Sequence, residues 1–152
     1  MGKFITSYLG PTFRKENIPA KIIFGENPLW AVYMPQLKMV SSKDFTDTIL
    51  QNYPEAKDFN LIAAGHGYSL SPDIMPIKVD KEYLKTAILP FEMAEKADIP
   101  VWITEISDVN PLDISIHDGL KWAVTFHNYL TKANVNAIIW WGGAMPTSNN
   151  DC

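Results

Sequence analysis

The sequence predicts an α/β fold built on a parallel β-sheet. Four short runs of apolar and β-branched residues alternate along the chain with segments that have helical periodicity. Such alternation is typical of parallel strands joined by right-handed crossovers, in a layered or a barrel architecture. The 152 residues, 47% hydrophobic and 20% charged, suffice for one domain or for a piece of a larger one.

The four predicted strands are short, and each ends in a polar or glycine-containing loop. They cover 21–25, 59–66, 100–107 and 137–143. Pro100 fixes the start of the third strand, and β-branched and aromatic residues fill it. We find no sign of a linker between these segments, so we treat residues 1–152 as a single domain.

Helical patterns precede the first strand and are broken early. Residues 3–9 have helical spacing that Gly10-Pro11 interrupts, and another short turn is expected over 12–15. The apolar, aromatic-rich stretch 28–40 is predicted to be a loop or a broken helix.

Three further helices are expected between the later strands. Ser41 followed by Asp44 is typical of a helix N-terminus, and Tyr53-Pro54 ends that helix. The other two helices are predicted over 81–97 and 118–133, of which the second has the clearer amphipathic pattern.

Composition and motifs exclude several classes of function. The net charge of −4 provides no basic stripe, which argues against a nucleic-acid partner. The single cysteine, Cys152, permits no disulfide framework and no thiolate metal cluster. No apolar run is long enough to span a membrane. The glycine-rich nucleotide fingerprints and the GxSxG elbow are absent.

Polar and aromatic residues gather where the predicted strands end. A carboxylate inside a strand buried on both faces would be costly, whereas Glu105 near a strand's carboxyl end is a candidate catalytic group. In parallel sheets ligands bind outside the carboxyl ends of the strands. The residues expected at this rim are Glu26, Asn27, His66, Tyr68, Glu105, Trp140 and Trp141.

Several segments together resemble the second half of a glycoside hydrolase family 30 catalytic domain. They are Trp102-Ile103-Thr104-Glu105-Ile106-Ser107, Tyr8-Leu9-Gly10-Pro11, Ala64-Gly65-His66-Gly67-Tyr68, the closing run 137–141 and the helical stretch 119–130. The resemblance covers nearly the whole chain. It implies half of a (β/α)8 TIM barrel, in which the four strands are the fifth to eighth.

The resemblance also implies a retaining β-glycosidase or endo-glycanase that hydrolyses a β-linked carbohydrate through two carboxylates, with no cofactor and no metal. Glu105 matches the nucleophile. Trp140 and Trp141 alternate across the sheet, so one is expected to be a sugar platform and the other a core residue. The residues expected to bind substrate are Asn27, His66, Tyr68, Trp140 and Trp141. The family spans several glycans, and its members are often secreted or lysosomal, so neither the glycan nor the compartment is predicted.

The second carboxylate is the main departure from the family pattern. The family carries its acid/base in an Asn-Glu motif at the end of the fourth strand, which would precede residue 1, and no Asn-Glu pair occurs in this chain. Glu26 reads as a loop residue rather than a substitute acid. We therefore expect weak or no turnover from this chain alone. A non-catalytic carbohydrate-binding or scaffold half-barrel is the alternative.

Half a barrel leaves one face of its sheet without a partner. The inward-facing residues are expected to be Ile22, Ile62 or Ala63, Ile103, and Ile138 or Ile139. Because an exposed apolar face of that size drives association, we expect the chain to pair with a copy of itself or with the missing half.

Overall fold

A computed structural model describes residues 1–31, 40–68, 88–108 and 114–142. Its centre is a four-stranded sheet in the order β1-β2-β3-β4, and every neighbouring pair is parallel. The strands are β1 (Ile22–Phe24), β2 (Leu61–His66), β3 (Val101–Ile106) and β4 (Ala137–Trp140). The predicted α/β class and all four strands are confirmed, apart from residue 143, which lies outside the described residues.

The helices follow the predicted order. Before the first strand lie α1 (Gly2–Phe4), the π-helical turn η1 (Ile5–Leu9) and α2 (Gly10–Lys15). After it come α3 (Ser42–Asn52), the 3-10 turn η3 (Pro54–Asp58), α5 (Glu92–Lys96) and α6 (Ile116–Lys132). Of the helix expected over 81–97, residues 92–96 are helical as α5, the described residues 88–91 are not, and 81–87 lie outside the described part of the chain, as do 32–39 of the expected loop. No described helix has the length and apolarity needed to cross a membrane.

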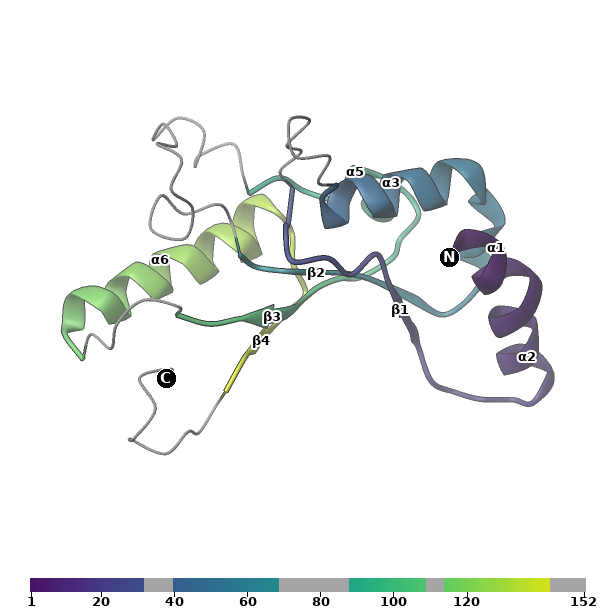
Figure 1. Ribbon diagram of the computed structural model, residues 1–152, viewed down its shortest axis with the longest axis horizontal. Helices are drawn as coiled ribbons and strands as arrows, with labels where there is room; N and C mark the ends of the chain where they lie inside the picture. The colour runs from purple at the N-terminus through teal and green to yellow at the C-terminus, as the bar shows by residue number, and fades with distance from the viewer. Residues whose placement is uncertain (32–39, 69–87, 109–113, 143–152) are drawn as a thin grey trace.

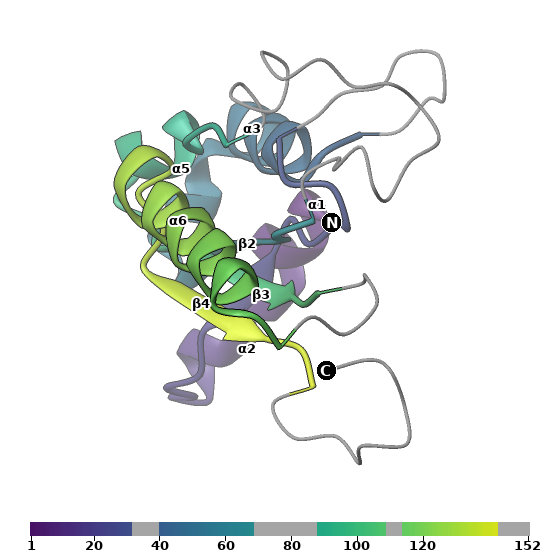
Figure 2. The ribbon, with the colours of Figure 1, turned by 90° about the vertical axis from the view of Figure 1, so that its left-hand side faces the viewer.

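Three helices, α3, α5 and α6, lie on the same side of the sheet (Figure 1; Figure 2). The core between helices and sheet is built on large aromatic side chains that exclude water. The Trp30 ring lies 4.4 Å from Phe91 and 5.3 Å from Tyr129, centroid to centroid, and all three residues are fully buried. Trp30 is therefore a packing residue of the core.

The surroundings of Gly65 show which face of the sheet meets the helices. A Cβ at Gly65 would lie 2.6 Å from the Ser42 Cβ and 3.3 Å from the Trp30 ring, so this position faces α3. Ile103 is the register partner of Gly65 and therefore faces the same way. The prediction that Ile103 lies on the open face is wrong.

The same correction holds for the first strand. Ile22 is buried in the core cluster, whereas the next residue, Ile23, is 46% exposed on the other face. Ile62 pairs with Ile23 and so lies on the same face, where it is nevertheless buried at 2% exposure, whereas Ile139 on that face is 47% exposed. These strands are apolar on both faces, so the sequence does not reveal which residues of each strand face the helices.

The N-terminal helical segment differs from its prediction at Gly10-Pro11. The helix does not stop there but continues through η1 into α2. Gly10 donates its backbone N–H to Ile5 O, a hydrogen bond one residue longer than in an α-helix, and Pro11 falls in the first turn of α2. Pro11 has no N–H with which to continue the α-helical pattern, and the π-helical turn just before it lets the helix run on.

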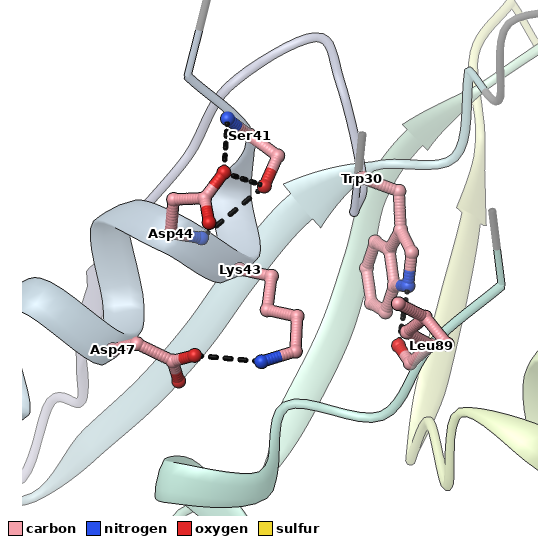
Figure 3. A network of polar contacts seen from close by, with 6 residues as sticks. All are labelled: Trp30, Ser41, Lys43, Asp44, Asp47 and Leu89. Atoms are coloured by element: carbon pink, nitrogen blue, oxygen red, sulfur yellow. Dashed lines mark hydrogen bonds and ion pairs between the residues drawn. The ribbon is translucent and has the colours of Figure 1, made fainter. Parts of the chain in front are cut away.

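Side-chain caps fix where α3 begins, as predicted. Figure 3 shows Ser41 and Asp44 in a reciprocal capping box: Ser41 Oγ accepts from Asp44 N at 3.2 Å, and Asp44 Oδ2 accepts from Ser41 N at 3.1 Å. One turn further on, Lys43 Nζ lies 2.6 Å from Asp47 Oδ2. Trp30 Nε1 donates to Leu89 O at 3.0 Å in the same view, so its buried indole N–H is satisfied.

Three of the turns that lead from a helix into a strand use the left-handed backbone conformation. Asn17, Asp98 and Asn134 have φ values of 52°, 55° and 52°, and they precede β1, β3 and β4. Asn and Asp tolerate this conformation better than other residues with a Cβ. Because all four strands are parallel, their carboxyl ends lie at one edge of the sheet.

Candidate active site

The polar residues predicted at the carboxyl ends of β2 and β3 lie together. His66 and Glu105 are direct register partners in the two adjacent strands. Between this pair and the preceding pair, Gly65 and Ile103, β3 has one residue more than β2, which is a β-bulge. Bulges re-aim side chains near the ends of strands. Here the bulge places Glu105 beside His66, on the face that the helices leave open.

Tyr68 fixes the Glu105 carboxylate. Its hydroxyl donates to Glu105 Oε1 at 3.1 Å, and its oxygen shares a second hydrogen bond of 3.0 Å with Ser107 Oγ. The Glu105 side chain is 26% exposed, so it is partly screened from water but still reachable. Within the described residues, no hydrogen bond or ion pair engages the second carboxylate oxygen, Oε2.

The pKa of Tyr68 is raised above its ordinary value of 10.0, mainly by burial; the Ser107 hydrogen bond lowers it, and the hydrogen bond and charge of Glu105 raise it further. The Tyr68 hydroxyl therefore stays protonated around neutral pH. It acts as a hydrogen-bond donor to Glu105 rather than as a base.

The imidazole of His66 contacts two carboxylates. His66 Nδ1 lies 3.6 Å from Glu105 Oε1, and His66 Nε2 lies 3.8 Å from Glu26 Oε1. The Tyr68 ring meets the imidazole edge-on, with 6.0 Å between centroids. The Glu26 side chain is 49% exposed, which fits the predicted loop residue. The His66 ring therefore lies between the two carboxylates and beside the Tyr68 ring, at distances longer than a hydrogen bond.

Hydrogen bonds to the backbone fix the end of β2, where His66 lies, and the following residue Gly67. His66 N donates to Asn27 O at 3.0 Å, and Gly67 N donates to Glu105 O at 2.7 Å. The buried Tyr129 of α6 donates its hydroxyl to Gly67 O at 2.9 Å. Three elements distant in sequence therefore fix the position of His66 and Tyr68.

Asn27, expected to bind substrate, has its side-chain oxygen engaged within its own turn. Asn27 Oδ1 accepts from Leu29 N at 3.0 Å, and Asn27 O accepts from Ser42 Oγ at 3.0 Å as well as from His66 N. The structure thus places Asn27 beneath the site, where it supports the backbone of His66.

Trp140, the last residue of β4, and Trp141, which follows it, have different surroundings. The Trp140 ring packs edge-on against Trp122 at 4.8 Å and against Phe126 at 5.9 Å, both on α6. Trp141 is 57% exposed, and its backbone N–H donates to Ile106 O at 2.8 Å. Trp140 therefore belongs to the helix-covered side, and Trp141 is the aromatic ring left open at the rim.

Two residues of the site were not predicted as functional. Ser107 follows Glu105 by two positions, and an alternation argument would have placed both side chains on one face. Tyr129 lies 62 residues from the carbonyl that it contacts, and no local pattern reveals such a pair. Within the described ranges, no group of three or more His, Cys, Asp or Glu residues could hold a metal ion.

No protein-family model matches this sequence, and no curated protein matches it. Any functional assignment therefore depends on the arrangement of Glu105, Tyr68 and His66, together with the resemblance described above.

Proposed function

We propose that this chain is the second half of the (β/α)8 barrel of a retaining β-glycosidase, with Glu105 as the nucleophile. The observation that carries the proposal is the hydrogen bond from Tyr68 to Glu105 at the carboxyl edge of the parallel sheet. In α/β barrels this edge carries the catalytic residues. Glu105 is partly exposed on the open face, as a residue that must reach a sugar has to be.

In the proposed reaction a Glu105 oxygen attacks the anomeric carbon, and the bond from that carbon to the leaving oxygen breaks. The leaving group departs with the bonding electron pair and takes a proton from a general acid. Water then cleaves the glycosyl ester and restores the carboxylate. Tyr68 donates to Oε1, which orients the carboxylate and leaves Oε2 free to attack.

The described site contains no carboxylate suited to act as the general acid. A retaining acid/base sits roughly 5–5.5 Å from the nucleophile and is tuned to hold its proton near neutral pH, for example by apolar surroundings. Glu26 is half exposed and contacts the far nitrogen of His66. An exposed loop carboxylate of this kind is poorly suited to hold a proton near neutral pH. We therefore do not assign Glu26 as the general acid.

The half-barrel part of the proposal is supported by the way the sheet is covered. The helices α3, α5 and α6 lie on one face of the sheet (Figure 2), and on the other face Ile23 of β1 and Ile139 of β4 are about half exposed. A complete barrel would enclose that face with four more parallel strands.

The test is to trap the glycosyl-enzyme with 2,4-dinitrophenyl 2-deoxy-2-fluoro-β-glycosides. Dinitrophenolate leaves without protonation, so an absent general acid does not prevent the first step, and the fluorine slows hydrolysis of the ester. Intact-mass spectrometry should show one added fluoroglycosyl group on the wild-type chain. Glu105→Gln should show none, and the matched variant Glu26→Gln should still be labelled.

A folded wild-type chain that takes up no label from gluco, xylo or fuco reagents would contradict the glycosidase proposal. Equal labelling of Glu105→Gln would also contradict it.

Carbohydrate binding without chemistry is a second candidate, which the exposure of Trp141 favours. An indole ring open to solvent beside a polar rim is a surface on which the apolar face of a sugar can stack. Calorimetric titration with β-linked oligosaccharides distinguishes the two functions. Binding that Trp141→Ala weakens, with no label on Glu105, would favour the binding module.

A further inference from the structure

An apolar ridge runs along the outside of α6. Ile116, Leu120 and Val124 are spaced four residues apart, so they lie in one row, and they are 72%, 55% and 60% exposed. The opposite side of α6 already packs inward through Trp122, Phe126 and Tyr129. A helix with apolar residues on two sides needs a neighbour on each side.

A second apolar patch lies on the N-terminal helical segment. Phe4 and Tyr8 stack with 6.2 Å between ring centroids and are 55% and 59% exposed. Ile5, between them in sequence, is buried in the core. Figure 1 shows α1 and α6 at opposite ends of the molecule, so the two patches do not cover each other.

The sheet also has an outer strand on each side. β1 and β4 are its outer strands, and within the described ranges neither pairs with a further strand on its outer edge. Unpaired strand edges are templates for pairing with another chain. Both strands run in the same direction, so an edge of β4 could continue into a β1 placed parallel to it.

We infer that two copies of this chain join as a closed dimer, in which β4 of each copy pairs with β1 of the other. The α6 ridge of one copy then packs on the Phe4–Tyr8 patch of its partner. A twofold axis along the barrel keeps all eight strands parallel and uses each surface once per copy, so the contact closes. This inference rests on the half-barrel proposed above, but not on the glycosidase chemistry.

The exposed apolar area is large enough for a stable interface. The two patches and the open-face residues Ile23 and Ile139 are each 46–72% exposed. At the ~150–250 Å² that a large side chain can bury, they amount to roughly 800 Å² per copy. A stable protein–protein interface buries about 800 Å² per partner.

Light scattering after size-exclusion chromatography tests the dimer. The wild-type chain should have twice the mass of one copy at micromolar concentration. Leu120→Asp and Tyr8→Asp should each raise the dimer dissociation constant by about 30-fold or more, because both change central contact residues. Thr48→Asp, on an exposed position of α3, is the matched control and should leave the mass unchanged. A wild-type monomer would overturn the inference.

Cysteine cross-linking tests which surfaces meet. In a Cys152→Ser background, Tyr8→Cys and Val124→Cys should each fail to cross-link alone, and an equimolar mixture should form disulfide-linked dimers. Cross-linking of Val124→Cys with itself, or no cross-linking in the mixture, would overturn the proposed arrangement. A cross-linked dimer that takes up no fluoroglycosyl label would contradict the glycosidase proposal and leave the dimer standing.

Discussion

The two faces of the sheet differ in how closely they are packed. The face beneath α3, α5 and α6 is closely packed around the fully buried side chains of Trp30, Phe91 and Tyr129. The open face carries Trp141, 57% exposed, and the half-buried Glu105. The covered face holds the aromatic core, and the open face carries Glu105 and Trp141 of the proposed site. Substitutions on the two faces should therefore separate stability from binding and chemistry.

The largest effect is expected on the covered face, at Trp30. Trp30→Ala removes a buried indole that contacts two aromatic rings and donates to Leu89 O. Such changes cost about 3–5 kcal/mol in the free energy of unfolding. Urea denaturation followed by circular dichroism measures this loss, and a cost under about 1 kcal/mol would show that the covered face is not the stabilising one.

Next in size is the loss of the Tyr68 hydroxyl. Tyr68→Phe keeps the ring beside His66 but removes the donor to Glu105, and a hydrogen bond to a charged group is worth about 1.5–3 kcal/mol. We expect labelling by the fluoroglycoside to slow by about 10–100-fold, since the carboxylate is no longer oriented. An unchanged labelling rate would mean that Tyr68 does not position the nucleophile.

The raised pKa of Tyr68 sets the pH range of this contact. Because the folded pKa lies above the ordinary value of 10.0, the neutral phenol and its hydrogen bond persist below pH 10 and are lost only as the pH rises through the raised pKa. The tyrosinate absorbance of wild type minus Tyr68→Phe should therefore rise above pH 10. A difference that rises below pH 10 would contradict the assignment.

Trp141 is the open-face counterpart of Trp30. Trp141→Ala should change the free energy of unfolding by less than about 0.5 kcal/mol, as exposed positions usually do. It should weaken oligosaccharide binding by about 10-fold, the loss expected for one stacked ring. Trp140→Ala is the contrasting variant, because its ring packs on Trp122 and its loss should chiefly lower stability.

The smallest effect concerns a helix cap on the covered side. Ser41→Ala breaks the capping box with Asp44 and should cost about 1 kcal/mol of unfolding free energy. Labelling of Glu105 should stay at the wild-type rate, because the cap contacts neither Glu105 nor Tyr68. A labelling defect as large as that of Tyr68→Phe would show that the two faces are not separable.

Local patterns were enough to predict the strands, the Ser41 cap and the gathering of polar groups at the carboxyl edge. A capping box and a β-branched run act over a few residues, and parallel strands necessarily share an edge. The prediction that Ile22 and Ile103 face away from the helices was wrong. In a strand that is apolar on both faces, the sequence does not show which residues point toward the helices. The helix through Gly10-Pro11 was missed because a π-helical turn accommodates the proline.

Long-range contacts within the site could not be predicted from local patterns. The bulge in β3 that sets Glu105 opposite His66 has no sequence signature here. Which of Trp140 and Trp141 is exposed depends on where α6 packs, and the role of Asn27 depends on backbone donors from Leu29 and His66. Tertiary packing decides each of these, so only a structure reveals them.

Mapping the fluoroglycosyl label to one residue tests the central claim most directly. After reaction with the dinitrophenyl fluoroglycoside, a peptic digest analysed by tandem mass spectrometry should place the added mass on Glu105, within the peptide that spans β3. A label on Glu26 or any other carboxylate, with Glu105 unmodified in a folded chain, would contradict the account.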